Sequence, residues 1–231
     1  ILISGPTGSG KTSTLYASIN QLDKAESKII TIEDPVEYRF AGLSQVQVNR
    51  QAGVTFASGL RAAMRLDPDV ILVGEIRDQE TAETAVQASL TGHLVLSSIH
   101  ANDTVGAIFR LIDLGVEPFL VTSSLLGVLS QRLVRRVCTK CRTPQEAPEP
   151  ERLAYEQALG ESRTQFDYGV GCSNCADTGY RGRLAVFELL QVNDAIRRAV
   201  LRGANSDELR RAALESGMST MLHEGMKRVR E

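Results

Sequence analysis

The chain contains 231 residues, of which 42% are hydrophobic and 23% are charged. These proportions are those of an ordinary globular protein, and no apolar run approaches the roughly 18 residues that a membrane-spanning helix needs. The net charge of −2, the absence of Trp and an aromatic content of 5% argue against nucleic acid, whose binding proteins usually carry a basic surface. We therefore expect no nucleic-acid partner and no direct membrane insertion.

The first predicted element is a short apolar strand at residues 1–3, and a glycine-rich run follows it directly. The run matches the phosphate-binding pattern G-x-x-x-x-G-K-[ST] and consists of Gly5, Pro6, Thr7, Gly8, Ser9, Gly10, Lys11 and Thr12. In such loops backbone N–H groups converge on phosphates at the positive end of the next helix. Lys11 is expected to neutralise β- and γ-phosphate charge and Thr12 to bind Mg²⁺. A glycine-rich turn that matches by chance is the alternative.

Strands and helices alternate along the next part of the chain. The predicted helices and strands are, in order, helix 11–22, strands 28–32 and 43–48, helix 56–66, strand 70–73, helix 80–90, strand 93–99, and helices 104–114 and 118–130. This alternation indicates an α/β fold, a RecA-like P-loop core with a mostly parallel sheet and helices on both faces. Ligands bind such sheets at the carboxyl ends of the strands.

Three candidate catalytic side chains follow separate predicted strands. Glu33 is placed as the catalytic base, and Glu75 is placed to hold the Mg²⁺ shell, although the two could exchange roles. His100 could donate a hydrogen bond to the γ-phosphate, whereas His93, at the other end of its strand, is expected to meet a neighbouring subunit. Asp34 could support the metal's water shell or simply fix a turn. The acids could also be surface turn residues, and His100 a packed or solvated one.

All four cysteines belong to two C-x-x-C pairs, and they are Cys138, Cys141, Cys172 and Cys175. Two such turns can present four thiolates to one tetrahedral ion, which predicts a structural Zn²⁺ site. Two disulfides or a redox dithiol are the alternatives.

The parts of the chain predict three regions. Residues 1–134 form the ATPase core, 135–185 a tetracysteine zinc-binding lobe, and 186–231 a C-terminal helical segment. Within these regions, 143–150 resembles a linker because it holds three prolines, and 194–231 predicts two or three short helices. The helix that starts near residue 206 is expected to be capped by Ser206 or Asp207.

With these motifs the chain resembles the secretion-superfamily ATPases, which are hexameric motors of type II secretion and type IV pilus assembly. The resemblance covers essentially the whole length. It is carried by the phosphate loop at 5–12, an Asp box at 31–38 (TIEDPVEY), a Walker B segment at 61–78 that ends in GEIRD, and a His box at 91–100.

The tetracysteine lobe is similar to that of the secretion and pilus-extension ATPases and is absent from the retraction motors. Residues 114–120 and 123–135 look more like the type II secretion (general secretion pathway protein E) group. The resemblance therefore implies an ATP-hydrolysing motor that powers protein secretion across the outer membrane, with a pilus assembly ATPase as the alternative. A nucleic-acid translocase and a non-catalytic nucleotide-binding scaffold are less favoured.

The resemblance also implies ATP, Mg²⁺ and structural Zn²⁺ as cofactors, a homo-hexamer, and a cytoplasmic location peripheral to the inner membrane through secretion platform proteins. The family carries an N-terminal domain ahead of the phosphate loop, and its arginines reach the nucleotide. Because this chain starts after that domain, we expect it to bind ATP but to hydrolyse it slowly, since loss of such arginines costs about 10³–10⁵ in rate.

Overall fold

The computed structural model describes residues 1–230, and the chain divides into two compact units. Unit 1 contains Ile1–Ser130 together with Leu189–Met218, and unit 2 contains Gln131–Glu188 together with the chain from Ser219 onward. The segment 186–231, predicted as one region, is therefore shared between the two units. Within residues 1–230, no helix has both the length and the apolar composition to cross a bilayer.

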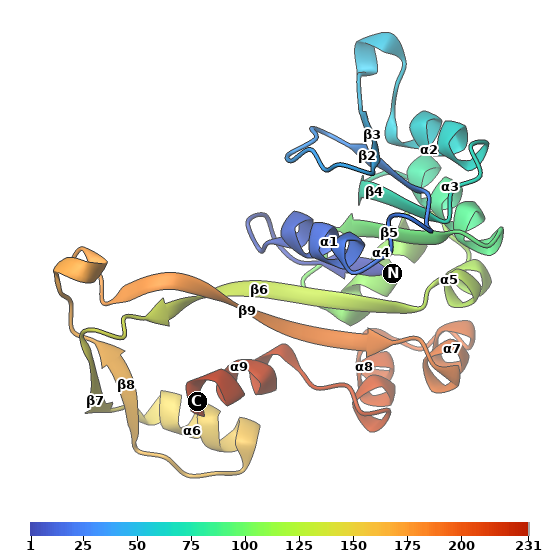
Figure 1. The fold of residues 1–231 in the computed structure, drawn as a ribbon. Helices are drawn as coiled ribbons and strands as arrows, with labels where there is room; N and C mark the ends of the chain where they lie inside the picture. Colours follow the sequence, from blue (N-terminus) through green and yellow to red (C-terminus); the bar gives the residue numbers. More distant parts are fainter. Residues whose placement is uncertain (231) are drawn as a thin grey trace. The chain divides into compact units, whose positions relative to one another are not determined.

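A seven-stranded sheet has the strand order β3-β2-β4-β5-β1-β6-β9 (Figure 1). Its strands are β1 (Leu2–Ser4), β2 (Ile29–Glu33), β3 (Ser44–Gln47), β4 (Val70–Ile76), β5 (Leu94–Ile99), β6 (Gly127–Val137) and β9 (Tyr180–Gln191). The pairs β1–β5, β1–β6, β2–β3, β2–β4 and β4–β5 are all parallel. The predicted mostly parallel sheet is confirmed.

Helices of unit 1 contribute to cores on both faces of this sheet. They are α1 (Lys11–Asn20), α2 (Phe56–Met64), α3 (Gln79–Leu90), α4 (Thr104–Asp113), α5 (Pro118–Ser124), α7 (Asp194–Leu201) and α8 (Ser206–Glu215). Neighbouring strand residues alternate between two separate clusters: Ile71 lies in the larger cluster, whereas Leu72 packs with Ile19 of α1 in the smaller one. Because successive strand side chains point to opposite faces, the wholly apolar strands are covered on both sides.

The predicted helix 118–130 is wrong in its second half. Helix α5 ends at Ser124, and Gly127 begins β6. Val128 and Ser130 are fully buried, and Leu2 of β1 is in register with Val128. The reason is tertiary: β1 has an open edge that needs a hydrogen-bonding partner, and pairing outweighs the weak helical pattern.

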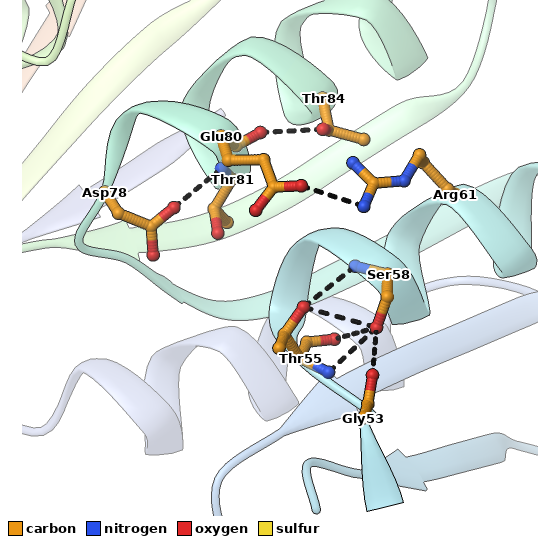
Figure 2. Close-up of polar contacts among 8 residues, drawn as sticks. All are labelled: Gly53, Thr55, Ser58, Arg61, Asp78, Glu80, Thr81 and Thr84. Atoms are coloured by element: carbon orange, nitrogen blue, oxygen red, sulfur yellow. Dashed lines mark hydrogen bonds and ion pairs between the residues drawn. The ribbon is translucent and has the colours of Figure 1, made fainter. Parts of the chain in front are cut away.

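Side-chain caps fix the starts of α2 and α3, the helices before and after β4 in the chain (Figure 2). Thr55 and Ser58 form a reciprocal capping box at α2, and Asp78 accepts a hydrogen bond from the Thr81 N–H at 2.8 Å. Arg61 of α2 then lies 2.9 Å from Glu80 of α3. Since Asp78 directly follows the GEIR run, its cap ends the segment that carries Glu75.

The C-terminal part contains the predicted short helices, α7, α8 and α9 (Met221–Arg230). The predicted cap of α8 is wrong by one or two residues, because Asn205 is the N-cap. Its side chain accepts a hydrogen bond from the Glu208 N–H, and the Glu208 carboxylate accepts one from the Asn205 N–H. The pattern N-x-x-E is a capping box with Asn in place of Ser or Thr.

Unit 2 has its own small sheet and core. Strands β7 (Arg142–Glu146) and β8 (Gln165–Gly169) are antiparallel, and α6 (Glu149–Leu159) contributes Tyr155 to a cluster with Phe166. The linker predicted at 143–150 is thus a strand followed by a helix start. Pro144 is tolerated in β7 because, in this two-stranded sheet, one side of each strand needs no ladder partner.

Candidate active site

The phosphate loop leaves β1 at Ser4 and enters α1 at Lys11, as predicted. Its glycines adopt positive φ angles, 146° at Gly5, 76° at Gly8 and 88° at Gly10, which other residues rarely adopt. Gly10 is the N-cap of α1 and contributes no side-chain cap. The first N–H groups of α1 can therefore donate to an anion, at the positive end of the helix.

The Lys11 side chain folds back over this loop. Its Nζ donates to the carbonyl oxygen of Gly5 at 2.8 Å and to that of Pro6 at 3.1 Å. Burial lowers the pKa of Lys11, and the negative charge of Glu75 opposes that shift. The ammonium group is thus held at the loop, within electrostatic range of a carboxylate from β4.

Glu75 and His100 come together, as their predicted positions at neighbouring strand ends suggest. The His100 Nε2 lies 3.6 Å from Glu75 Oε2, and the Arg77 Nε lies 2.5 Å from the same oxygen. The Glu75 side chain is only 14% exposed, whereas His100 is 48% exposed. Both β4 and β5 reach this edge, because Ile76 pairs with Ile99 beyond an irregularity in the register.

Glu33, the acid predicted as the catalytic base, is the last residue of β2. It is buried and accepts hydrogen bonds from three side chains, Tyr16 (through its hydroxyl), Thr31 (at 2.6 Å) and Gln45 (at 3.1 Å). Burial first, and then the hydrogen bond to Glu33 and its charge, raise the pKa of Tyr16 to about 12. Glu33 therefore joins α1, β2 and β3, and both of its oxygens are already engaged.

Glu37 reaches the phosphate loop and was not among the predicted site residues. The Thr12 Oγ1 donates a hydrogen bond to Glu37 Oε1 at 3.1 Å, and Glu37 is exposed. The sequence prediction considered only acids directly after strands, so it passed over an acid beyond Asp34 and Pro35. A signal existed, since Glu37 lies inside the same Asp box as Glu33.

Two other residues have structural partners. Asp34 lies 3.8 Å from Arg50, with both side chains substantially exposed. The His93 Nδ1 lies 2.8 Å from the Ala88 carbonyl oxygen and 3.1 Å from Thr91 Oγ1, at the end of α3.

The four cysteine sulfurs lie within 4.8 Å of one another in unit 2. The Cys138–Cys172, Cys141–Cys175 and Cys172–Cys175 Sγ atoms are 3.9, 3.8 and 3.8 Å apart. Thiolates on a tetrahedral zinc ion, with Zn–S bonds of about 2.3 Å, are separated by roughly 3.8 Å. The cysteines therefore fit one tetrahedral ion, and the separations are far above the roughly 2.05 Å of a disulfide.

The cysteines of this cluster differ in acidity, since burial raises the pKa of Cys141 to about 12 whereas hydrogen bonds lower that of Cys138. The backbone N–H of Lys140, followed by the side chain of Asn174, lowers the pKa of Cys138 to about 6. The Asn174 Nδ2 lies 3.5 Å from Cys138 Sγ. A lowered thiol pKa assists metal binding, because the ligand is the deprotonated sulfur.

Comparison with known proteins places these features in a family. The model of the family described as "Type II/IV secretion system protein" matches residues 1–231. Type II secretion system protein E of Klebsiella pneumoniae is 56% identical over 205 residues, covering 89% of this chain and 41% of that protein. The type IV pilus assembly ATPase PilB of Myxococcus xanthus (strain DK1622) is 46% identical over 231 residues, covering 99% of this chain and 41% of PilB.

A solved structure of the pilus retraction motor PilT with bound ADP has the same fold, with a TM-score of 0.62 and 29% identity. The match covers 96% of this chain and 59% of the PilT chain. This chain therefore spans less than half the length of the two curated relatives and somewhat more than half of the solved structure.

Proposed function

Because this chain belongs to the type II/IV secretion system protein family, we propose that it is the nucleotide-binding part of an ATPase motor that powers protein export through a type II secretion system. The observation that carries the proposal is the phosphate loop at the start of α1, with Lys11 held over it and carboxylates from two directions beside it. The relatives named type II secretion system protein E support the choice of system.

ATP would bind with its β- and γ-phosphates against the N–H groups of residues 5–12. Lys11 would exchange its carbonyl contacts for phosphate oxygens, which removes charge repulsion as the γ-phosphate leaves. Mg²⁺, when bound, neutralises charge on the β- and γ-phosphates. Thr12 would turn its hydroxyl from Glu37 to that ion, and Glu75 would hold the ion's water shell from β4.

We assign the orientation of the attacking water to Glu37 rather than Glu33. A general base must present an accessible lone pair to the water. Glu33 is buried and already accepts three hydrogen bonds, from Tyr16, Thr31 and Gln45, whereas Glu37 is exposed. Glu37 accepts a hydrogen bond from the Thr12 hydroxyl, which a bound metal ion would draw away. The sequence predicts Glu33 as the base, and the kinetics of Glu33→Gln and Glu37→Gln distinguish the two assignments.

His100 would donate to the γ-phosphate from β5, while Glu75 Oε2 holds its Nε2 side. The tetracysteine cluster would bind one Zn²⁺ with a structural role, because four thiolates leave no open coordination position. These assignments agree with the predicted cofactors ATP, Mg²⁺ and Zn²⁺.

We further propose that the intact protein acts as a homo-hexamer on the cytoplasmic side of the inner membrane, bound to secretion platform proteins. A type IV pilus assembly ATPase is the second candidate, because PilB is 46% identical to this chain over almost its whole length. Deletion of the gene should abolish export of secreted enzymes while leaving surface pili intact. Loss of pili with normal export would favour the second candidate.

The biochemical test is steady-state ATP hydrolysis by the intact protein in Mg²⁺. Lys11→Ala should lower kcat by at least about a hundredfold, because electrostatic stabilisation of the transferred phosphoryl group is the main catalytic contribution. Equal hydrolysis by Lys11→Ala and the wild type would overturn the proposed function.

A further inference from the structure

The segment between β5 and α4 carries His100 at its start and Asp103 at its end. Asp103 uses both carboxylate oxygens. Its Oδ1 accepts a hydrogen bond from the Gly106 N–H at 2.7 Å and so caps α4, and its Oδ2 lies 2.6 Å from Nη2 of Arg210. Arg210 belongs to α8, far along the chain, and both groups lie in unit 1.

Asp103 is also next to the strand that leads into the phosphate loop. Its carbonyl oxygen accepts a hydrogen bond from the hydroxyl of Ser4, which is fully buried, at 3.5 Å. The residue therefore meets three elements: β1 through its backbone, α4 through one carboxylate oxygen, and α8 through the other. A displacement of Asp103 would move the short segment that begins at His100.

A second contact joins the same two regions. The Thr104 Oγ1, fully buried at the start of α4, lies 3.4 Å from the sulfur of Met218, just beyond α8. Leu209 of α8 packs in the same core cluster as Val105 of α4. The apolar contacts hold α8 against α4, whereas the Arg210–Asp103 pair fixes the direction of the segment before α4.

The Arg210 and Asp103 side chains are about one-third exposed, at 34% and 31%. An ion pair with this exposure is shielded from water more than a surface pair, but its contribution to overall stability is modest. The pair matters more for the position of Asp103 than for overall stability, because its charge-assisted hydrogen bond holds a residue that also caps a helix. The proposed chemistry does not use the Arg210–Asp103 ion pair, so its role must be a different one.

We propose that Arg210 is a positioning residue of the nucleotide site, which acts through Asp103 to hold His100 toward Glu75 and the γ-phosphate. The inference rests on the proposed function. It assigns to α8, in the C-terminal part of the chain, an effect on catalysis that the phosphate loop and the acids do not reveal.

The test is ATP hydrolysis by the intact protein carrying Arg210→Ala, with exposed Arg211→Ala on the same helix as the matched control. Arg210→Ala should lower kcat about ten- to hundredfold, as expected for a misplaced catalytic group, with KM for ATP changed less than about threefold. Arg210→Lys should recover part of kcat, and Arg211→Ala should match the wild type. Equal kcat in Arg210→Ala and Arg211→Ala would overturn the inference.

Asp103→Asn provides a second route that keeps α4 capped, because Asn is as good an N-cap as Asp. It should lower kcat as Arg210→Ala does, and the double variant should be no slower than either single variant, since both remove one interaction. Single defects that multiply in the double variant would contradict the inference. A loss of kcat that Arg210→Lys does not reduce at all would also contradict it.

Lys11→Ala distinguishes failure of the proposed function from failure of the inference about Arg210. If Lys11→Ala hydrolyses ATP as fast as the wild type, the proposed function falls and this inference falls with it. If Lys11→Ala abolishes hydrolysis and Arg210→Ala leaves kcat unchanged, only the role of Arg210 is excluded.

Discussion

Glu33 and Glu37 share one short segment but have opposite environments. Glu33 is buried beneath three hydrogen-bond donors, and Glu37 is exposed with a loop hydroxyl as its partner. A buried carboxylate that accepts three hydrogen bonds organises the elements around it, whereas an exposed carboxylate beside the phosphate loop is accessible to a bound water. The distinction depends on where the chain turns after Asp34, which strand-end reasoning does not capture.

Glu37→Gln should therefore affect chiefly catalysis, and Glu33→Gln chiefly stability. Glu37→Gln should lower kcat for ATP hydrolysis by about 10²–10⁴-fold with an unchanged melting temperature, because it removes a general base. Glu33→Gln should chiefly lower the melting temperature, since an amide cannot accept all three hydrogen bonds. Steady-state kinetics and thermal unfolding of both variants check this, and the reverse ranking of kcat would return the base to Glu33.

Tyr16 gives the fold a dependence on alkaline pH. Its pKa is raised from 10.0 to about 12 in the folded protein, so the folded state holds this proton more tightly than the unfolded state. The resulting stability is present below pH 10 and is lost as pH rises from about 10 to about 12.

Tyr16→Phe lacks this titration, so its free energy of unfolding should fall less steeply than that of the wild type across the same interval. Urea unfolding of the two proteins at about pH 9 and about pH 11 measures the difference, in which titrations common to both proteins cancel. Parallel loss of stability in the two proteins would show that Tyr16 does not titrate as described.

At the scale of elements, the four-cysteine cluster is the feature that organises one end of unit 2. Two turns supply the sulfurs, and the second turn is the short 3₁₀ segment Ser173–Cys175. Structural zinc contributes about 10–16 kcal/mol in finger peptides, which is ample to order a small lobe.

Cys172→Ser should abolish stoichiometric zinc and make unit 2 sensitive to protease, while ATP-analogue affinity, which depends on unit 1, is retained. Ser173→Ala, an exposed change in the same turn, is the control and should keep one zinc per chain. Elemental analysis and limited proteolysis report the outcome. Full zinc content in Cys172→Ser would exclude a four-thiolate site.

The elements that the sequence predicted well are those with an unambiguous local pattern. The apolar runs of β1, β2, β4 and β5 and the phosphate loop were all found, because burial on both faces leaves no polar alternation. Residues 127–130 and 142–146 were not found. Each became a strand through a partner distant in sequence, β1 in one case and β8 in the other.

The candidate site follows the same division. The loop residues, Glu75, His100 and the cysteines were predicted from motifs and strand ends, and their geometry brings the expected groups together. Glu37 and Arg210 were not predicted. Both lie outside a strand end, and their contacts with Thr12 and Asp103 exist only once the chain has folded.

For the molecule as a whole, the family match confirms the resemblance found in the sequence. The proposed nucleotide site and the proposed zinc site lie in different units. Unit 1 holds every group assigned to the nucleotide, and unit 2 holds the cysteine cluster. Since the chain covers less than half of its curated relatives, the proposed motor activity belongs to the intact protein, whereas nucleotide binding is testable on these residues directly.

The most direct test of the central claim is a crystal structure of this chain with Mg²⁺ and a non-hydrolysable ATP analogue. The account predicts the β- and γ-phosphates against the N–H groups of residues 5–12, with Thr12 Oγ1 on the metal ion and no longer bonded to Glu37. A nucleotide bound elsewhere, or phosphates in the loop with Glu37 and Glu75 both directed away from the metal, would contradict it.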